Sequence, residues 1–298
     1  MRALTTELAA AKLNLCLFLG PLRGDGRHEL VTLLDSLTLF DGLEVVAASS
    51  DEVVCDGVDG PNLVDTAIAR LRAGGWDAPP VSVRIRKRIP IAAGMGGGSA
   101  DAAAMLRLAP RLAPIDQCRI EEIAVALGAD VPGQLRPGPS LATGAGEVVR
   151  TLPPFAAYGV LVLPQPFGLS TGDVYREADR LGLPRQASDL ASLRRDLEAE
   201  LVQAAPAVPE RLAVNDLERA ALSLAPELAD ALRVTRETGA DRALICGSGP
   251  TVVGVFHGRD GADRARTSAE RLARTHAGVV AAEPLGLTGP QDRALPGG

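Results

Sequence analysis

The stretch Gly94–Ala104 reads GMGGGSADAAA, with four glycines and a serine directly before an alanine-rich segment. An alternating pattern, VSVRIRKRIP (81–90), comes before it and predicts a half-buried strand. Helical spacing follows it, from about 99 to 109. Each glycine costs roughly 0.5–1 kcal/mol relative to alanine in ordered structure. The junction between strand and helix must therefore need bare backbone.

Phosphate binding would explain that need. Backbone N–H groups at a helix N-terminus carry partial positive charge, and glycine lets a phosphate approach the main chain closely. Ser99 is able to cap the helix, or to reach a phosphate or its magnesium ion. A Walker A loop is excluded because no Gly-Lys-Ser/Thr ends the run, and a Rossmann fingerprint because helices follow helices here. A tight glycine-rich turn without a ligand remains the alternative.

Length and composition indicate a globular protein of two domains. The chain has 298 residues, and we expect a division at Pro153-Pro154 into domains 1–153 and 154–298. A net charge of −6 argues against a nucleic-acid-binding surface. No apolar run reaches the ~20 residues that a membrane helix needs, and the N-terminus lacks a signal-peptide pattern. We therefore expect a cytoplasmic protein with reduced, mostly buried cysteines. No histidine or cysteine spacing predicts a metal site.

The order of strand and helix patterns predicts an α+β sandwich of the split βαβ kind. In the first half we expect a strand at 13–20, a hairpin around Asp41-Gly42 within 36–49, a helix at 62–75, helices at about 99–109 and 117–127, and a hairpin within 140–152. In the second half we expect a strand at 158–163, helices at about 171–182, 188–203 and 215–238, two strands within 243–256, a helix at 261–275 and a strand at 278–282. The tail after Thr288 is expected to be frayed.

Lysine is rare in this arginine-rich chain. Lys12 and Lys87 are its only lysines. Lys12 lies between apolar stretches, a costly place for a free charge, which makes it the better functional candidate. For Lys87, inside RIRKR, function and drift remain equally open.

Six blocks of sequence together resemble one known family. IPIAAGMGGGSADAAA (89–104) resembles the phosphate loop of the GHMP kinases, the superfamily of galactose, homoserine, mevalonate and phosphomevalonate kinases. The blocks at 9–37, 127–135, 169–175, 215–218 and 247–256 resemble, in the same order, those of the 4-diphosphocytidyl-2-C-methyl-D-erythritol kinases. The resemblance implies a two-domain fold, with an N-terminal domain like the second domain of ribosomal protein S5 and a ferredoxin-like C-terminal domain.

The resemblance also implies an activity: ATP-dependent phosphorylation of the 2-hydroxyl of a cytidine diphosphate-linked methylerythritol, in non-mevalonate isoprenoid synthesis. The implied catalytic residues are Lys12 and Asp130, with Asp130 as the base and Lys12 as its electrostatic partner. The implied site for ATP with Mg²⁺ consists of Pro90, Ile91, Ala92, Ala93, Gly94, Met95, Gly96, Gly97, Gly98, Ser99 and Ala100. The implied substrate-binding residues are Asn14, Arg27, His28, Thr171 and Tyr175.

Several alternatives remain open at this point. Asp130 could instead cap a helix after Gly128, and Lys12 could pair with a structural acid. GSGPT (247–251) is either a plain turn or a segment that packs near the phosphate loop. Competing functions are another GHMP small-molecule kinase, such as homoserine or mevalonate kinase, and a non-catalytic nucleotide-binding regulator.

The chain departs from the family pattern at three positions: Arg27 stands for a tyrosine, Gly133 for a phenylalanine and Ala100 for a serine. Ala100 leaves Ser99 to do any hydroxyl work. A guanidinium can stack as a tyrosine does, so we expect cytosine to lie between Arg27 and Tyr175. His28 would then read the polar edge of the base. The alternative is a core tyrosine and a solvated arginine.

Overall fold

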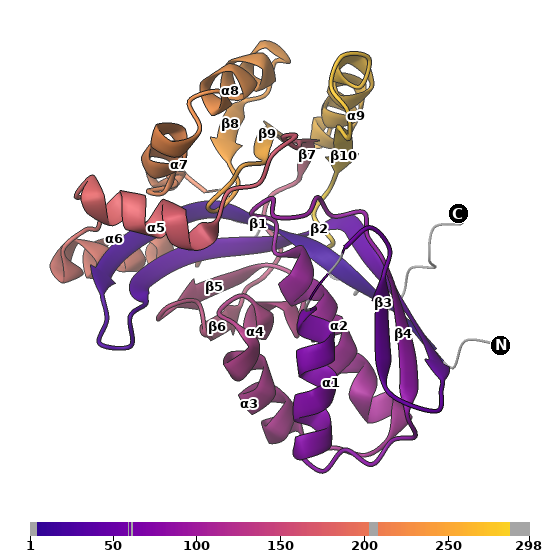
Figure 1. Cartoon of the computed structure of the whole chain (residues 1–298). Helices are drawn as coiled ribbons and strands as arrows, with labels where there is room; N and C mark the ends of the chain where they lie inside the picture. The colour runs from indigo at the N-terminus through magenta and orange to yellow at the C-terminus, as the bar shows by residue number, and fades with distance from the viewer. Residues whose placement is uncertain (1–4, 59, 61, 203–207, 287–298) are drawn as a thin grey trace.

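The computed structural model describes residues 5–58, 60, 62–202 and 208–286, which form two antiparallel-rich sheets with helices packed on them (Figure 1). The expected frayed tail lies outside the described residues. Among the described helices, none combines the length and the apolar character needed to cross a membrane.

Two long strands form the backbone of the first sheet. β1 (Thr5–Leu22) runs antiparallel to β2 (His28–Ala47) along most of its length. The other edge of β2 is shared, because β4 (Val81–Arg86) pairs with residues 42–47 and β5 (Ser140–Thr143) with residues 32–34. The sheet is completed by β3 (Glu52–Cys55), parallel to β4, and β6 (Val148–Thr151), antiparallel to β5. Residues 35–41 of β2 therefore lie between the segment that pairs with β5 and the segment that pairs with β4.

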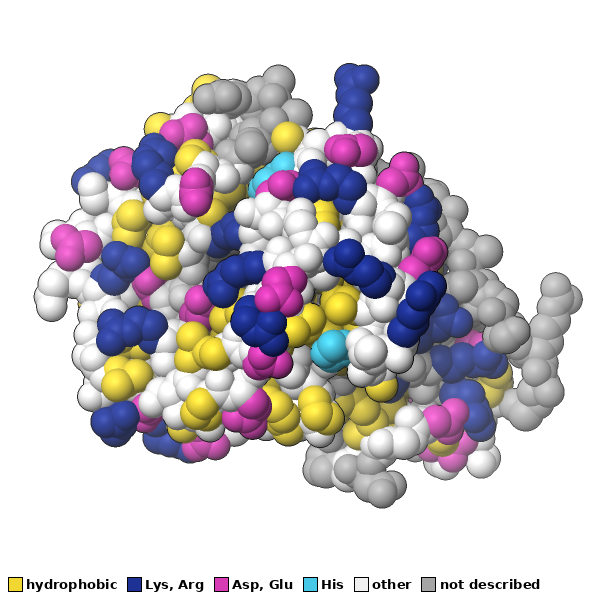
Figure 2. Space-filling view, turned by 90° about the horizontal axis from the view of Figure 1, so that it is seen from above, with side chains coloured by type: hydrophobic (Ala, Val, Ile, Leu, Met, Phe, Trp, Pro, Cys, Tyr) yellow, Lys and Arg dark blue, Asp and Glu magenta, His cyan; other side chains and the backbone are white. Residues whose placement is uncertain are grey.

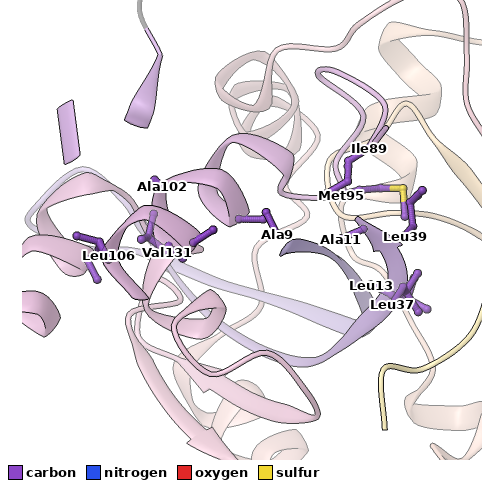
Figure 3. Close-up of a cluster of buried hydrophobic side chains, with 14 of the residues drawn as sticks. Ala9, Ala11, Leu13, Leu37, Leu39, Ile89, Met95, Ala102, Leu106 and Val131 are labelled. Carbon is purple, nitrogen blue, oxygen red and sulfur yellow. The ribbon is translucent and has the colours of Figure 1, made fainter. Parts of the chain in front are cut away.

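Four helices cover one face of this sheet. They are α1 (Leu63–Ala73), α2 (Gly97–Leu112), α3 (Gln117–Leu127) and the single turn α4 (Val131–Gln134). The core has two visible groups, one around Ala102, Leu106 and Val131, and one where Met95 and Ile89 lie beside Leu39 (Figure 3). The small side chains of α2 let it lie close to β1.

The second sheet has the order β10-β7-β9-β8, with every neighbour antiparallel. Its strands are β7 (Tyr158–Leu163), β8 (Arg242–Ile245), β9 (Val252–His257) and β10 (Val280–Ala282). The accompanying helices are α5 (Thr171–Arg180), α6 (Ala187–Glu200), the 3-10 turn η1 (Glu210–Leu212), α7 (Glu218–Leu224), α8 (Leu228–Glu237) and α9 (Gly261–Leu272). Because β9 lies between β7 and β8, this is the split βαβ arrangement of a ferredoxin-like domain.

The outer face of the second domain carries mixed charge. Seen from above, acidic and basic side chains are interspersed over its helices (Figure 2). Exposed ion pairs of this domain include Arg233–Asp230 on α8 and Arg264–Asp241, which involves α9. Exposed pairs of this kind contribute little to stability, so we assign this face no binding role.

Most of the predicted elements are confirmed, including the α+β class, the helix at 62–75 and the hairpin within 140–152. Asn62 begins α1 by accepting a hydrogen bond from the Val64 N–H (2.9 Å). The strand predicted at 13–20 is part of the much longer β1. The division at Pro153-Pro154 falls between the last strand of one sheet and the first of the other. It stays a prediction, because one hydrophobic cluster draws residues from both sides of it.

Two predictions about elements are wrong. The hairpin at Asp41-Gly42 does not exist, since β2 continues through both residues. The buried Asp41 carboxylate instead accepts the backbone N–H groups of Arg88 (2.5 Å) and Ile89 (2.8 Å), where β4 leads into the glycine loop. The single helix predicted at 215–238 is two helices, α7 and α8, because Pro226 cannot continue α7.

A buried hydrogen bond joins the two sheets. Tyr158 of β7 donates its hydroxyl to the Asp35 carboxylate of β2 (2.8 Å), and the Ser36 N–H donates to the same carboxylate. Burial raises the pKa of Asp35 to about 6, although both hydrogen bonds act to lower it. The protonated form of Asp35 is therefore favoured in the folded state relative to the unfolded chain.

This shift predicts a pH dependence of stability. Between about pH 4 and pH 6 the folded state holds a proton that the unfolded state has released, so the contribution of Asp35 to stability falls as pH rises through this window. Asp35→Asn removes the titration and keeps a hydrogen-bond acceptor. Urea unfolding should show the variant gaining about 2–3 kcal/mol on the wild type between pH 4 and pH 7. A stability difference independent of pH would contradict the assignment.

Candidate active site

The glycine loop lies between β4 and α2 and leaves the first turn of α2 open. Gly96 is the N-cap residue in the left-handed conformation (φ 70°), and no side chain caps the helix. The Ala100 N–H closes the first turn on the Gly96 carbonyl (2.8 Å). The N–H groups of the three residues between them, Gly97–Ser99, are the free donors that a helix start offers to an anion.

The side chain of Met95 anchors this loop in the core. It is 1% exposed and lies beside Ile89 and Leu39 (Figure 3). The Met95 carbonyl accepts the Lys12 N–H (3.0 Å), which ties the loop to β1. Ala100 is fully buried as well. Met95 and Ala100, both expected in the ATP site, therefore have their side chains in the core and do not line the cavity described below.

A second glycine turn, residues 246–251 between β8 and β9, packs directly against the first. A Cβ on Gly94 would lie 2.1 Å from the Cys246 carbonyl oxygen and 3.0 Å from the Gly249 nitrogen. Gly94 also has φ 75°, a conformation that favours glycine. Of the two readings left open for GSGPT, both hold: the segment is a turn, and it packs against the glycine loop.

The residues of the NDLE block hold this second turn in place. Asn215 donates its amide to the carbonyls of Ile245 (2.9 Å) and Gly247 (2.7 Å). Asp216 accepts the Leu19 N–H of β1 (2.9 Å) and pairs with Arg185. The block therefore fastens the turn of the second domain to the long strand of the first.

Lys12 lies where the pairing of β1 with β2 is irregular. The register shifts between Ala10 and Lys12 and again between Asn14 and Cys16, and such irregularities redirect side chains. Lys12 is buried, and its Nζ donates to Asn14 Oδ1 (2.5 Å). Among the described residues it has no carboxylate within ion-pair distance, so the structural ion pair that remained possible for Lys12 is not formed.

A chain of hydrogen bonds orients this lysine. Asn14 donates its amide to Thr32 Oγ1 (2.8 Å), and Thr32 donates to the Cys16 carbonyl (2.6 Å). A Cβ on Gly247 would lie 3.0 Å from Lys12 Nζ, so the second turn leaves only enough room for the ammonium. Thr32 carries no sequence motif that would mark it, and its place in this chain of hydrogen bonds follows only from the pairing of β1 with β2.

Asp130 stands at the N-cap position of α4, but its side chain makes no capping hydrogen bond. In the described part of the chain its carboxylate has neither a hydrogen-bond partner nor an ion-pair partner. Burial raises the pKa of the Cys246 thiol, with Lys12 acting to lower it and Asp130 to raise it. The Asp130 carboxylate is therefore available to a ligand.

Lys87 serves a different purpose from Lys12. Its ammonium lies beneath the glycine loop and pairs with Asp41 and with Asp101 Oδ2 (2.7 Å). Burial acts to lower the pKa of Lys87, but the two carboxylates outweigh it and raise the pKa. Burial and the neighbouring Asp41 raise the pKa of Asp101. A Cβ on Gly97 would lie 3.2 Å from Lys87 Nζ, so this ion pair directly supports the start of α2.

A cavity of about 650 Å³ lies between the two domains, a size suited to small-molecule ligands. The predicted site residues that line it are Lys12, Asn14, Pro90, Ile91, Ala92, Ala93, Gly94, Gly96, Gly97, Gly98, Ser99, Asp130, Thr171 and Tyr175. The free N–H groups of α2, the ammonium and the carboxylate thus share one space. Such a space can bind a polyphosphate, take a proton from a hydroxyl and stabilise charge on a transferred phosphoryl group.

The residues expected to grip a base are only partly brought together. Tyr175 lines the cavity, and burial and the Asp130 carboxylate raise the pKa of its hydroxyl. Thr171 Oγ1 lies 3.1 Å from Ser248 Oγ, and both residues line the cavity. The ring that lies beside Tyr175 is that of His28, with 5.5 Å between centroids. Arg27 is exposed in the β1–β2 turn and does not line the cavity. The structure therefore does not set its guanidinium opposite Tyr175.

The contact between the two glycine turns generates a prediction about Gly94. Gly94→Ala should lower stability by about 1–3 kcal/mol or more, because the new methyl group meets the Cys246 carbonyl and requires an unfavourable φ. A thermal melt measures this. Gly98→Ala is the matched control, since its Cβ would meet nothing nearer than Leu63 Cδ1 at 3.8 Å. Equal melting temperatures for the two variants would contradict the contact.

Comparison with known proteins identifies both halves of the chain. Residues 62–138 match the model of the GHMP kinases N terminal domain, and residues 189–274 match that of the GHMP kinases C terminal. A 4-diphosphocytidyl-2-C-methyl-D-erythritol kinase of Pelotomaculum thermopropionicum is 38% identical, over 91% of this chain and 94% of the relative. The enzyme of the same name from Salinispora tropica is also 38% identical, over 93% of this chain and 92% of its own length.

Solved structures agree with these relatives. A crystal structure of 4-(cytidine 5'-diphospho)-2C-methyl-D-erythritol kinase superposes with a TM-score of 0.74 at 32% identity, covering 94% of this chain and 98% of that one. A mevalonate kinase from L. major superposes with a TM-score of 0.65 at 13% identity, covering 97% and 99%. The second likeness is one of fold alone.

Proposed function

The chain belongs to the family of 4-diphosphocytidyl-2-C-methyl-D-erythritol kinases, within the GHMP kinases, and from this premise we propose that it transfers the γ-phosphoryl group of ATP to the 2-hydroxyl of that cytidine-linked sugar alcohol. It is a small-molecule kinase. The observation that carries the proposal is that one cavity holds an open helix N-terminus and a carboxylate with no partner among the described residues, in a chain 38% identical to such kinases over nine-tenths of its length. The reaction would take place in the cytoplasm, as part of isoprenoid synthesis.

In this proposal the glycine loop binds the phosphates of ATP. The N–H groups of Gly97–Ser99 point at the anion, and the dipole of α2 favours its charge. Ser99, which lines the cavity, is the residue that would hold Mg²⁺ beside the phosphates. Mg²⁺ needs few protein ligands, because it keeps waters and phosphate oxygens. Bound there, it would neutralise phosphate charge.

Asp130 would accept the proton of the acceptor hydroxyl. Among the described residues the carboxylate has no competing partner, so it is free to orient that hydroxyl toward the phosphate. Lys12, held by Asn14, would stabilise the negative charge that develops between nucleophile and phosphoryl group. The proton would move from the hydroxyl to the carboxylate as the new oxygen–phosphorus bond forms and the bond between the γ-phosphorus and the bridging oxygen breaks, so that ADP leaves.

A panel of acceptors tests the proposed substrate. ADP release from ATP is measured with 4-diphosphocytidyl-2-C-methyl-D-erythritol, homoserine and mevalonate, each as the sole acceptor. We expect turnover with the cytidine-linked acceptor only. Faster turnover with either of the other alcohols would assign the chain a different substrate within the superfamily.

Asp130→Asn should reduce kcat by roughly 10²–10⁴-fold, because it removes a proton acceptor and keeps the size of the side chain. The fold and ATP binding should not change, since the carboxylate bonds to no other residue that the structure describes. Steady-state kinetics and titration with a non-hydrolysable ATP analogue check the two parts. Near-normal turnover would contradict the role of the base.

The two lysines provide a matched control for this catalytic pair. Lys12→Met should abolish turnover with little loss of stability, because no carboxylate within the described ranges pairs with Lys12. Lys87→Met should instead lower stability by about 3–5 kcal/mol, because it strands the buried carboxylates of Asp41 and Asp101. Equal losses of turnover and of stability in the two variants would contradict these separate roles.

Tyr175→Ala should raise the KM for the cytidine-linked acceptor by roughly 5–150-fold, the equivalent of the 1–3 kcal/mol that base stacking contributes. Tyr175→Phe keeps the ring and should stay near the wild type. The KM for ATP should not change in either variant. Parallel loss of ATP and acceptor binding would instead indicate a damaged core.

A further inference from the structure

One partly buried polar contact crosses between the domains near the cavity. His28 Nε2 lies 2.7 Å from Asp179 Oδ1, with side-chain exposures of 4% and 44%. His28 is the first residue of β2, and Asp179 lies near the end of α5, which runs over the β1–β2 ribbon in Figure 1. The contact therefore fastens α5, a helix of the second domain, onto a strand of the first.

The same contact leads to the cavity wall. Tyr175 and Asp179 are four residues apart on α5 and so share one face of the helix. The His28 ring contacts both residues: it is hydrogen-bonded to Asp179, and its plane is tilted by 38° relative to the ring of Tyr175. Tyr175 lines the cavity, whereas His28 and Asp179 do not. Asp179 therefore contacts His28, His28 contacts Tyr175, and Tyr175 lines the cavity.

We propose that Asp179 is a positioning residue for the acceptor site, acting through His28 on the Tyr175 ring. An aspartate carboxylate only accepts hydrogen bonds, so it selects the His28 tautomer with the proton on Nε2 and fixes the plane of that ring. The fixed imidazole then packs against Tyr175 and restricts its rotation. The proposal rests on the proposed function in one respect, namely that Tyr175 receives the cytosine.

The other charged residues of α5 provide the comparison. Arg176 pairs with Asp173, and Arg180 pairs with Glu177, whose carboxylate also accepts the Ser223 hydroxyl (2.5 Å). These pairs lie on the helix surface, and none of them lines the cavity. Asp173→Ala therefore removes an aspartate from the same helix without touching His28, and is the matched control for Asp179→Ala.

Steady-state kinetics with a double-mutant cycle measure the effect on the substrate. Asp179→Ala should raise the KM for the cytidine-linked acceptor roughly 5–30-fold, with kcat and the KM for ATP unchanged. Asp179→Asn, which keeps an acceptor for the Nε2 proton, should fall between that variant and the wild type. In a Tyr175→Ala background the Asp179→Ala change should add little, since its effect passes through the missing ring. Additive effects, or a fall in kcat or in ATP binding, would overturn the proposal.

Nitrogen-15 NMR tests the positioning without any substrate. The chain has three histidines, His28, His257 and His276, so each tautomer can be followed separately. At a pH where all three are neutral, His28 should be a single Nε2-protonated tautomer in the wild type and in Asp173→Ala, and a mixture in Asp179→Ala. An unchanged His28 in Asp179→Ala would overturn the proposal. If His28 responds but the cytidine-linked acceptor is not phosphorylated by the wild type, the proposed substrate fails and the positioning of Tyr175 stands.

Discussion

The structure depends on a backbone contact between two glycine turns that lie about 150 residues apart in the chain. Gly94 meets the Cys246 carbonyl and the Gly249 nitrogen at distances that exclude any side chain. This contact holds the first sheet against the second. Asn215 stabilises the second turn by donating hydrogen bonds to the carbonyls of Ile245 and Gly247. Because the turns touch here, the start of α2 and the buried lysine of β1 face the same cavity. Interiors are close-packed, so a single added methyl group would be felt on both sides.

The electrostatics of the site follow from the different ways in which two cations are buried. Lys87 is neutralised by two carboxylates and supports the loop from beneath. Lys12 donates to the amide oxygen of Asn14 and has no carboxylate partner in the part of the chain that the structure describes. A buried cation without a counterion is costly unless a ligand supplies the opposite charge. The site is therefore suited to an anion, and in the proposed function the Asp130 carboxylate, which has no partner among the described residues, would supply the base for phosphoryl transfer to an alcohol.

Local patterns in the sequence were enough to predict most helices, the split βαβ topology and the glycine loop at the start of α2. They failed where a tertiary contact overrode a local signal. Asp41-Gly42 reads as a turn, but the carboxylate is used to hold the backbone at the end of β4. Thr32 and Asp179 carry no motif, and their roles follow only from the pairing of β1 with β2 and from the packing of α5. Arg27 was expected at the cavity on resemblance, and the turn that carries it leads away into solvent.

The central claim is that this cavity directs a phosphoryl group onto one hydroxyl of the acceptor. Proton-coupled phosphorus-31 NMR of the product tests this most directly, because carbon 2 of a 2-C-methylerythritol unit carries no hydrogen. Transfer to the 2-hydroxyl predicts one new phosphomonoester signal without three-bond proton splitting, formed in equal amount with ADP. A doublet or triplet would mean that a secondary or primary hydroxyl had been phosphorylated, and ADP formed without any new ester would mean that the cavity transfers the phosphoryl group to water. Either of these results would contradict the account.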